Sequence, residues 1–291
     1  MPEDGVSEVK IQSWAQLMDE VYAGSWDPQL ARHRSPFVFR GAGACDQALT
    51  TSLMRLAAGR EPVARIEGHL IRNFRKYARS GIRGDTIWNW LALAAHHSLP
   101  TRLLDWSFSP LVALHFATAD VSLYDRDAVV WCVNHRQTNL RLPRRLREQL
   151  EIEGSDVFTV QMLERVVHSL EALASLAEEE FILFLEPPSL DARIVNQFAL
   201  FSLMSEPGLA LDRWLASHPG SARTLVLPSS LKWEVRDKLD QAGITERMLF
   251  PGLDGLTAWL TRYYAPRNQP IPPQEGSTLR DNPSATHPAC A

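Results

Sequence analysis

The chain has 291 residues, of which 45% are hydrophobic and 22% are charged, as in an ordinary globular protein. Its 30 basic and 34 acidic side chains leave a net charge of −4, which excludes a global electrostatic attraction to nucleic acid or anionic membranes. The three cysteines lack the spacing of zinc ligands, and their odd number favours a reducing compartment. We find neither a signal-peptide pattern nor an apolar run of the roughly 20 residues that a membrane helix needs, and we expect a cytoplasmic protein with no membrane partner.

Apolar spacing predicts helices and strands in mixed order, without the regular alternation of a doubly wound fold. Segments with the composition of strands are 9–12, 37–41, 102–105, 128–134, 181–187, 192–203 and 223–228. Segments with helical spacing are 13–22, 46–97, 110–119, 157–177, 208–218, 230–242 and 249–264. Three side chains are placed to cap the helices that follow them: Ser13, Asp85 and Ser109.

These elements predict an α+β fold, in which a central mixed or antiparallel sheet of about six strands carries inserted helices. We expect one domain over residues 1–265, with the motif-bearing core at 37–205 and C-terminal helices at 206–265. The remaining residues, 266–291, are rich in proline and polar side chains, so they predict a disordered tail.

A candidate anion site lies where the first apolar strand ends. Arg40 is followed by Gly41 and Gly43, and glycine lets a ligand approach the backbone closely. The guanidinium offers a rigid fork for a phosphate or a carboxylate. The alternative is an arginine exposed at the end of a strand.

Two adjacent histidines, His96 and His97, close a predicted helix. A cationic imidazole at a helix C-terminus is stabilised by the helix dipole, which is the simpler explanation. Neighbouring residues on a helix point about 100° apart, and the sequence places no further ligand nearby at a suitable spacing. We therefore expect no metal site.

Polar side chains crowd the segment that follows. Asp105 ends a short predicted strand, where it could orient a ligand, form a salt bridge with Arg102 or open a turn. Trp106 could stack on a planar ring, or it could lie in the core. Ser107 and Ser109 precede a helix whose first amide groups could bind an anion, although Ser109 is most simply its N-cap.

Further along the chain, Arg193 and Gln197 interrupt a β-prone apolar run. If this run is an alternating strand, the two side chains share one face with Val195, at a pocket or facing solvent. Glu186 is a further candidate carboxylate. Two arginine-rich stretches, 72–83 and 136–147, are typical of a solvated surface, with contact to nucleic acid or nucleotide phosphates as the alternative.

Several of these segments together resemble the FRG-domain family. The resemblance rests on FRG at 39–41, LPTRLLDWSFSPLVALHFA at 99–117 and RIVNQFALF at 193–201, and it extends over residues 37–260. The order of these motifs is similar to that of ADP-ribosyltransferase folds, which consume NAD. The resemblance therefore implies an ADP-ribosyltransferase-like fold with NAD as its substrate and no metal.

That resemblance also assigns roles. Arg40 would hold the NAD ribose or pyrophosphate, His97 or Trp106 would flank the nicotinamide, and loss of nicotinamide would pass through an oxocarbenium-like state stabilised by electrostatics. The implied catalytic residues are Arg40, His97, Asp105 and Gln197. The implied NAD-binding residues are Arg40, Gly41, His96, Trp106, Ser107, Ser109 and Arg193.

The sequence departs from the family pattern in three places. Ala95 and Ser98 stand where the family usually has glutamine and glycine, and Gln197 stands where such transferases have a catalytic glutamate. A neutral amide cannot neutralise a developing cation as a carboxylate does, and Glu186 is the candidate to supply that charge. Two functions follow: an NAD-using toxin or phage-defence effector that modifies a protein or nucleic acid, or a non-catalytic nucleotide- or partner-binding module of a bacterial defence or toxin system. An antitoxin or a neighbouring defence protein would be a partner of either.

Overall fold

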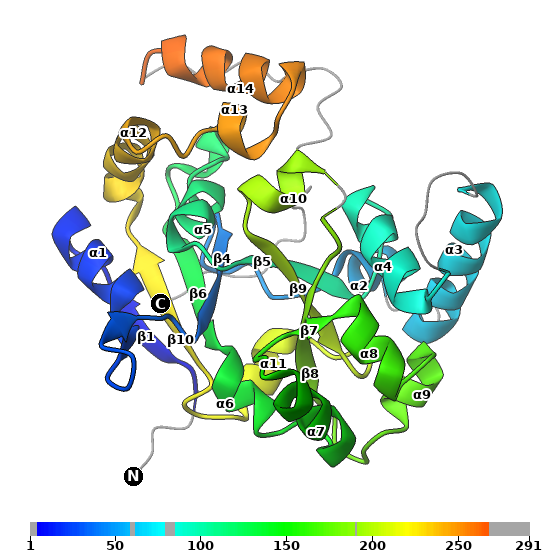
Figure 1. Cartoon of the computed structure of the whole chain (residues 1–291). Coiled ribbons are helices and arrows are strands. Elements are labelled where there is room, and N and C mark those ends of the chain that lie inside the picture. The colour runs from blue at the N-terminus through cyan, green and yellow to red at the C-terminus, as the bar shows by residue number, and fades with distance from the viewer. Residues whose placement is uncertain (1–4, 59–61, 79–84, 190, 268–291) are drawn as a thin grey trace.

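A single eight-stranded sheet organises the computed structural model, which describes residues 5–58, 62–78, 85–189 and 191–267 (Figure 1). The strand order is β1-β10-β6-β4-β5-β9-β8-β7. The edge pairs β1–β10 and β7–β8 are parallel, and the interior pairs are antiparallel. The prediction of a mixed sheet with inserted helices is confirmed, although the sheet has more strands than expected.

The strands are β1 (Ser7–Lys10), β4 (Phe37–Ala42), β5 (Leu103–Ser107), β6 (Ala128–Asn134), β7 (Phe158–Thr159), β8 (Ile182–Glu186), β9 (Ala199–Met204) and β10 (Ala222–Leu227). A separate two-stranded sheet joins β2 (Trp26–Asp27) to β3 (Arg32–His33).

Two groups of helices cover one face of the large sheet. Against the half formed by β4, β6 and β10 pack α1 (Trp14–Tyr22), α5 (Pro110–Ala117) and α12 (Lys232–Gln241). Against the half formed by β5, β9 and β8 pack α3 (Val63–Tyr77), α4 (Ile87–His96), α7 (Arg144–Glu153), α8 (Val160–Val166) and α9 (Leu170–Ala174).

The opposite face carries a third apolar cluster, which includes Val38, Leu104 and Trp106 and is covered in part by α11 (Leu211–Ala216). The remaining helices are α2 (Ser52–Ala57), α6 (His135–Asn139), α10 (Ala192–Asn196), α13 (Glu246–Leu249) and α14 (Leu253–Tyr264). In Figure 1, α10 lies between α5 and α4, and α13 and α14 lie above it.

The sheet is nearly divided between β4 and β5. These two strands share one register pair, Phe39 with Ser107, whereas β4 and β6 share six. On the face that carries both helix groups, α5 packs on the β4 half and α4 packs on the β5 half. The junction between β4 and β5 is therefore a seam between the two halves of the sheet. We call the region between the pair Phe39–Ser107 and α10 "the seam".

Local capping explains several helix starts. Ser13 accepts a hydrogen bond from Gln16 N, and Ser109 accepts one from Val112 N, as predicted. The prediction that Asp85 caps the next helix is wrong, because Thr86 is the N-cap. Asp85 instead accepts from Trp90 Nε1 and Arg75 Nη2, and these bonds lower its pKa.

Two expected elements are replaced by shorter ones. The long helix expected over 157–177 is wrong: the structure has β7, α8 and α9 there, and Ser169 caps a new helix after α8 ends. The strand expected from residue 192 is also wrong, because Asp191 accepts from the amides of Arg193 and Ile194 and starts α10. Phe198, at φ +48°, ends that helix and leads into β9.

The predicted tail, 266–291, lies outside the described residues except for its first two positions. Among the residues that the structure describes, no helix combines the length and apolarity needed to cross a membrane.

Candidate functional site at the seam of the sheet

Arg40 lies at the seam through a contact with the main chain of β5. Its Nη1 donates to the carbonyl oxygen of Asp105 at 2.7 Å, so the guanidinium spans the gap where the ladder between β4 and β5 stops. Because side chains alternate along a strand and Phe39 pairs with Ser107, Arg40 leaves the sheet on the face opposite to Asp105 and Ser107. Arg40 is half-buried, and the Asp105 side chain is exposed.

Gly41 serves the packing of α5 on β4. A Cβ atom at this position would lie 1.8 Å from the carbonyl oxygen of Ala113, so only glycine allows the helix to approach so closely. The sequence predicted that a ligand approaches the backbone here, but helix α5 of the same chain occupies that space. At Gly43 the nearest atom would be Leu123 Cδ1 at 2.9 Å, the end of a flexible side chain.

Ser107 and Ser109 fasten the end of β5 to its neighbours. Buried Ser107 Oγ donates to the carbonyl oxygen of Gln197 at 2.7 Å and accepts from the amide of Ser109 at 2.9 Å. Ser109 caps α5, and Pro110 occupies its first turn. Ser107 therefore holds the middle motif against the third one, and the hydroxyl groups of both serines are used within the fold.

The histidine pair is brought to the third motif. His96 Nε2 lies 2.7 Å from Asp191 Oδ2, which belongs to the residue that caps α10. The neighbouring His97 is exposed, and the two imidazoles meet edge to face with centroids 5.2 Å apart. One carboxylate thus both starts α10 and ties it to the end of α4.

The side chains of α10 are engaged with the segment around α13. Gln197 Nε2 donates to Leu249 O at 3.0 Å, and Asn196 Nδ2 donates to Met248 O at 2.7 Å. The exposed guanidinium of Arg193 lies 5.0 Å from the centroid of the Phe250 ring. Arg193 therefore lies in a short helix and Gln197 is its C-cap, so the shared strand face that sequence spacing suggested does not exist.

Trp106 belongs to the core. It is 3% exposed, its Nε1 donates to Ser202 Oγ at 2.9 Å, and its ring meets Phe184 edge to face at 5.9 Å. The structure therefore supports the core alternative for this residue, and the ring has no open side on which a ligand could stack.

Glu186 ends β8 on the face of Phe184, opposite to the face of Asp105. Partial burial raises its pKa above the ordinary value of a glutamate. It does not join Asp105 on one side of the seam. Among the described residues, no cluster of three or more side chains of the metal-ligating types occurs.

The alternative salt bridge between Asp105 and Arg102 is wrong. Arg102 is 3% exposed, and its guanidinium is bound by the buried carboxylate of Glu67, with Nε 2.8 Å from Oε2. Arg102 Nη1 also donates to Ser205 O at 2.9 Å. This pair joins α3 to β5 and β9, and no local pattern in the sequence indicated it, because its members are 35 residues apart.

A second buried polar network was also missed, and it fixes the C-terminal helices. Arg236 Nη1 lies 2.8 Å from Nδ1 of fully buried His115, and Arg262 donates to Asp240 and Glu246. Burial and the adjacent guanidinium groups lower the pKa of His115 to about 3, so its imidazole is neutral. The network ties α12, α13 and α14 to α5 and thereby supports the segment that holds Gln197.

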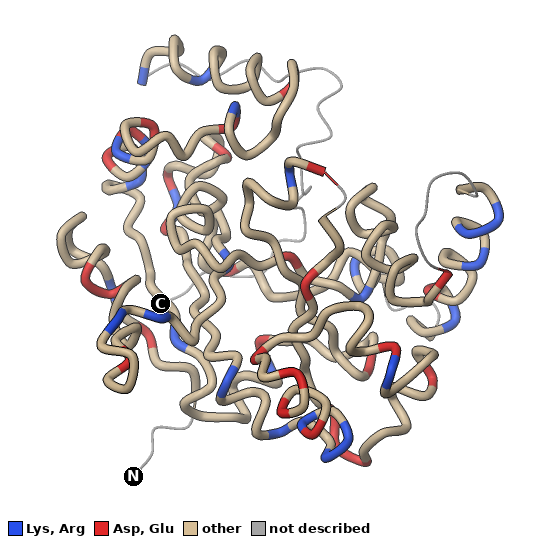
Figure 2. Tube along the Cα trace, viewed as in Figure 1, with Lys and Arg blue, Asp and Glu red and all other residues tan. Residues whose placement is uncertain are grey.

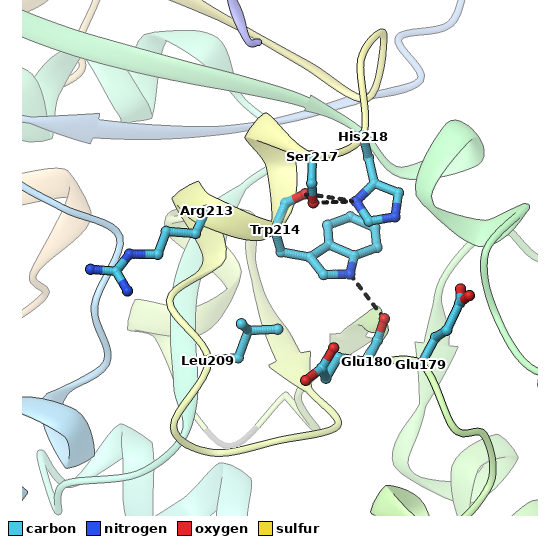
Figure 3. A pocket seen from close by; sticks show the side chains of 7 residues that line it. All are labelled: Glu179, Glu180, Leu209, Arg213, Trp214, Ser217 and His218. Atoms are coloured by element: carbon cyan, nitrogen blue, oxygen red, sulfur yellow. Dashed lines mark hydrogen bonds between the residues drawn. The ribbon is translucent and has the colours of Figure 1, made fainter. Parts of the chain in front are cut away.

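A hollow of about 240 Å³ lies elsewhere, at the start of β8 (Figure 3). It is lined by Glu179, Glu180, Leu209, Arg213, Trp214, Ser217 and His218. Trp214 stacks on His218 with centroids 4.0 Å apart and donates to Glu180 O at 2.9 Å. This hollow contains none of the residues that the motifs single out, and we assign the candidate site to the seam because the motif residues meet there.

Comparison with known families agrees with the motifs at the seam. Residues 35–126 match the family model of the FRG domain. Residues 35–126 of the chain are therefore assigned to an FRG domain. The matched range contains Arg40, the histidine pair and Asp105, whereas α10 and the supporting C-terminal helices lie beyond it. Searches of curated proteins and of solved structures gave no match.

Proposed function

We propose that this FRG-domain chain is an NAD-consuming, ADP-ribosyltransferase-like effector whose substrate binds at the seam. The observation that carries the proposal is that the Arg40 guanidinium reaches the main chain of Asp105 where the β4–β5 ladder ends, and that Ser107 fastens the end of α10 to the same strand. A dinucleotide offers an anionic pyrophosphate and ribose hydroxyl groups. A guanidinium binds the pyrophosphate, and a carboxylate accepts hydrogen bonds from the ribose hydroxyl groups.

Arg40 would hold the pyrophosphate, since its fork presents five N–H donors and Nη1 is already anchored on the Asp105 carbonyl. When NAD reacts, its glycosidic bond breaks and the electron pair leaves with nicotinamide, while the acceptor attacks the ribose carbon. The Asp105 carboxylate would stabilise the positive charge that develops on the ribose. Asp105 suits this task better than Glu186, because the Asp105 side chain is exposed on the residue whose main chain anchors Arg40, whereas Glu186 is partly buried and its pKa is raised.

Two of the other predicted residues position the third motif. His96 holds α10 through Asp191, and Ser107 holds the main chain of Gln197. His97 is exposed beside that contact and would flank the nicotinamide. Because Trp106 is buried, it receives no role in binding.

The biological setting is a further part of the proposal. We place the chain in the cytoplasm as a toxin or phage-defence effector that modifies a macromolecule, with an antitoxin or a neighbouring defence protein as its partner. The support is the resemblance of the motifs together with the buried thiol of Cys132, which fits a reducing compartment.

A second function, a non-catalytic module that binds a nucleotide or a partner, is favoured by one observation. Gln197 stands at the third motif and its amide is engaged with Leu249 O. This position therefore supplies no negative charge to a reaction.

The test is incubation of the purified chain with labelled NAD and cell lysate or RNA, with released nicotinamide measured by chromatography. Arg40→Lys keeps the charge but loses the fork, and Asp105→Asn keeps the shape but loses the charge. The enzyme proposal predicts label transfer by the natural chain and its loss in both variants. Arg213→Gln, in the hollow beside α11, is the matched control and should react normally.

Two outcomes decide between the functions. NAD binding without nicotinamide release or label transfer would establish the binding module and overturn the enzyme. Turnover that is equal in the natural chain and in Arg40→Lys would overturn the assignment of the site to the seam. Thermal unfolding of each variant separates these results from a simple loss of folded protein.

A further inference from the structure

The hollow at the start of β8 shares no lining residue with the seam. Its volume of about 240 Å³ is smaller than the roughly 300–1,000 Å³ of sites that hold drug-sized ligands. Figure 3 shows Trp214 in the middle of the side chains that line it. The hollow is therefore a separate cavity, and its size suits a ligand no larger than one long side chain.

A ring stack and an aliphatic side chain form the apolar part of the lining. Trp214 stacks on His218 with their ring planes 21° apart, and its Nε1 donates to the carbonyl oxygen of Glu180. The indole is thus fixed against the main chain that carries the acidic side chains of the hollow. Leu209 adds the aliphatic side chain. Together these groups offer a surface that can cover the hydrocarbon stem of a ligand.

His218 contributes a hydrogen-bond acceptor to the hollow. Its Nδ1 lies 2.7 Å from the carbonyl oxygen of Trp214, to which Ser217 Oγ also donates at 2.8 Å. Because a carbonyl oxygen only accepts, Nδ1 carries the hydrogen, and in the neutral imidazole the lone pair is then on Nε2. The second ring nitrogen is therefore able to accept a hydrogen bond from a ligand.

Two carboxylates at the hollow lack the partners that acidic side chains have elsewhere on the surface. On α7, Glu148 pairs with Arg144 at 2.6 Å, and Figure 2 shows basic and acidic positions mixed along that helix. Exposed Glu179 and Glu180 form neither a salt bridge nor a side-chain hydrogen bond with any residue that the structure describes. Exposed Arg213 also lines the hollow and pairs with neither of them. Two carboxylates and one guanidinium give the lining a net negative charge.

We propose that the hollow binds an organic cation, a primary ammonium group on a short hydrocarbon stem. The two carboxylates neutralise the charge, His218 Nε2 accepts a hydrogen bond from the ammonium group, and Trp214 and Leu209 cover the stem. A metal ion fits less well, because among the described residues no group of three or more ligating side chains occurs. This inference goes beyond the proposed function, because it concerns a cavity apart from the seam and requires no reaction of NAD.

The test titrates the full chain with n-butylamine, which has the charge and the stem of a lysine side chain, and follows the ligand by NMR at low salt without NAD. 1-Butanol and butyrate keep the stem but carry a neutral or a negative head group. Butylamine should bind at least about tenfold more tightly than butanol, and butyrate should bind more weakly still. A blocked pentapeptide with one lysine among glycines identifies the source: tighter binding than butylamine indicates a lysine of a partner protein, and equal or weaker binding indicates a free amine.

Three variants test the charges of the lining. Glu179→Gln with Glu180→Gln should weaken the binding of butylamine by about tenfold, because both negative charges are lost. The matched control, Glu151→Gln with Glu178→Gln, has the same net charge and changes two exposed residues outside the lining, so it should bind as the natural chain does. Arg213→Gln removes the positive charge from the lining and should strengthen binding by about two- to threefold.

Four results would overturn the proposal: no saturable binding of butylamine, equal binding of butylamine and butanol, equal losses in the two double variants, or weaker binding by Arg213→Gln. Thermal unfolding confirms that each variant is folded, as expected for changes at exposed side chains. The result is independent of the enzyme test. A chain that binds butylamine in the hollow but leaves NAD intact supports the cation site and removes the transferase, and turnover of NAD without binding of butylamine does the reverse.

Discussion

Two arginines of the recognised motifs, Arg102 and Arg40, have opposite surroundings. Arg102 is buried, and its guanidinium is held by Glu67 and by the carbonyl of Ser205. Arg40 is half-buried, and it donates to the main chain of Asp105 at the seam. A charge that is fully matched inside the protein holds the fold together, whereas a guanidinium at a partly open seam is able to bind a ligand.

The largest predicted effect comes from breaking the buried salt bridge between Arg102 and Glu67. Glu67→Ala should lower the free energy of unfolding by about 3–5 kcal/mol, because it leaves the buried charge of Arg102 without its partner. Urea unfolding measures the loss. The seam provides the contrast, since Asp105→Asn should cost less than about 1 kcal/mol at its exposed position. Equal losses at the two sites would remove the distinction between them.

The next largest effect is a fall in the free energy of unfolding at acidic pH. Burial lowers the pKa of His115 to about 3 and that of His135 to about 4, so both are neutral in the folded chain, whereas the unfolded chain protonates them near their ordinary value of 6.5. Below that value the unfolded state binds more protons, and stability therefore falls as the pH drops. Between about pH 6.5 and pH 5 each histidine should contribute a loss of about 2 kcal/mol.

Urea unfolding at several pH values measures this dependence. His135→Gln should flatten it, because one of the two buried imidazoles is removed. A free energy of unfolding that stays constant from about pH 6.5 to pH 5 would contradict the assignment of both histidines to the neutral interior.

Backbone packing beside Arg40 gives an intermediate effect. Gly41→Ala should destabilise the chain by about 1–3 kcal/mol, since its Cβ would meet the carbonyl of Ala113 and push α5 away from β4. Gly43→Ala is the matched variant and should cost less, because the Leu123 side chain can move. Thermal unfolding compares the two. A larger loss at Gly43 would contradict the packing explanation.

The smallest effect is expected on the surface of α3. Gly68 is exposed inside this helix, and a Cβ there would meet nothing within 4 Å. Gly68→Ala should therefore stabilise the chain by about 0.5–1 kcal/mol through higher helix propensity. Denaturant unfolding measures the gain, and a loss of stability would contradict the open surroundings of Gly68.

Local signals in the sequence predicted much of the fold. The strand that contains Arg40, which continues to Ala42 rather than ending at the arginine, the caps Ser13 and Ser109, and the strand at 128–134 depend on residues within one turn or one strand. The error at α10 has a physical cause. The β-branched residues Ile194 and Val195 favour a strand, but the cap formed by Asp191 starts a helix there.

The site was harder to predict, because its contacts are long-range. The motifs indicated which segments meet, but the hydrogen bond from Ser107 to Gln197 and the salt bridge from His96 to Asp191 join residues about 90 positions apart. Alternation along β4 and β5 determines that Arg40 and Asp105 start on opposite faces, and this follows only from the register of Phe39 with Ser107. Likewise, the support of Gln197 by Leu249 depends on packing that no motif contains.

Calorimetry of NAD binding tests the central claim, that Arg40 at the seam binds a ligand, most directly. The natural chain should bind NAD, and folded Arg40→Ala should bind it at least about tenfold more weakly, a loss of about 1.4 kcal/mol. Arg213→Ala, in the hollow beside α11, should bind as the natural chain does. An Arg40→Ala variant that remains folded and binds NAD with the natural affinity would contradict the account, as would a natural chain that binds no NAD.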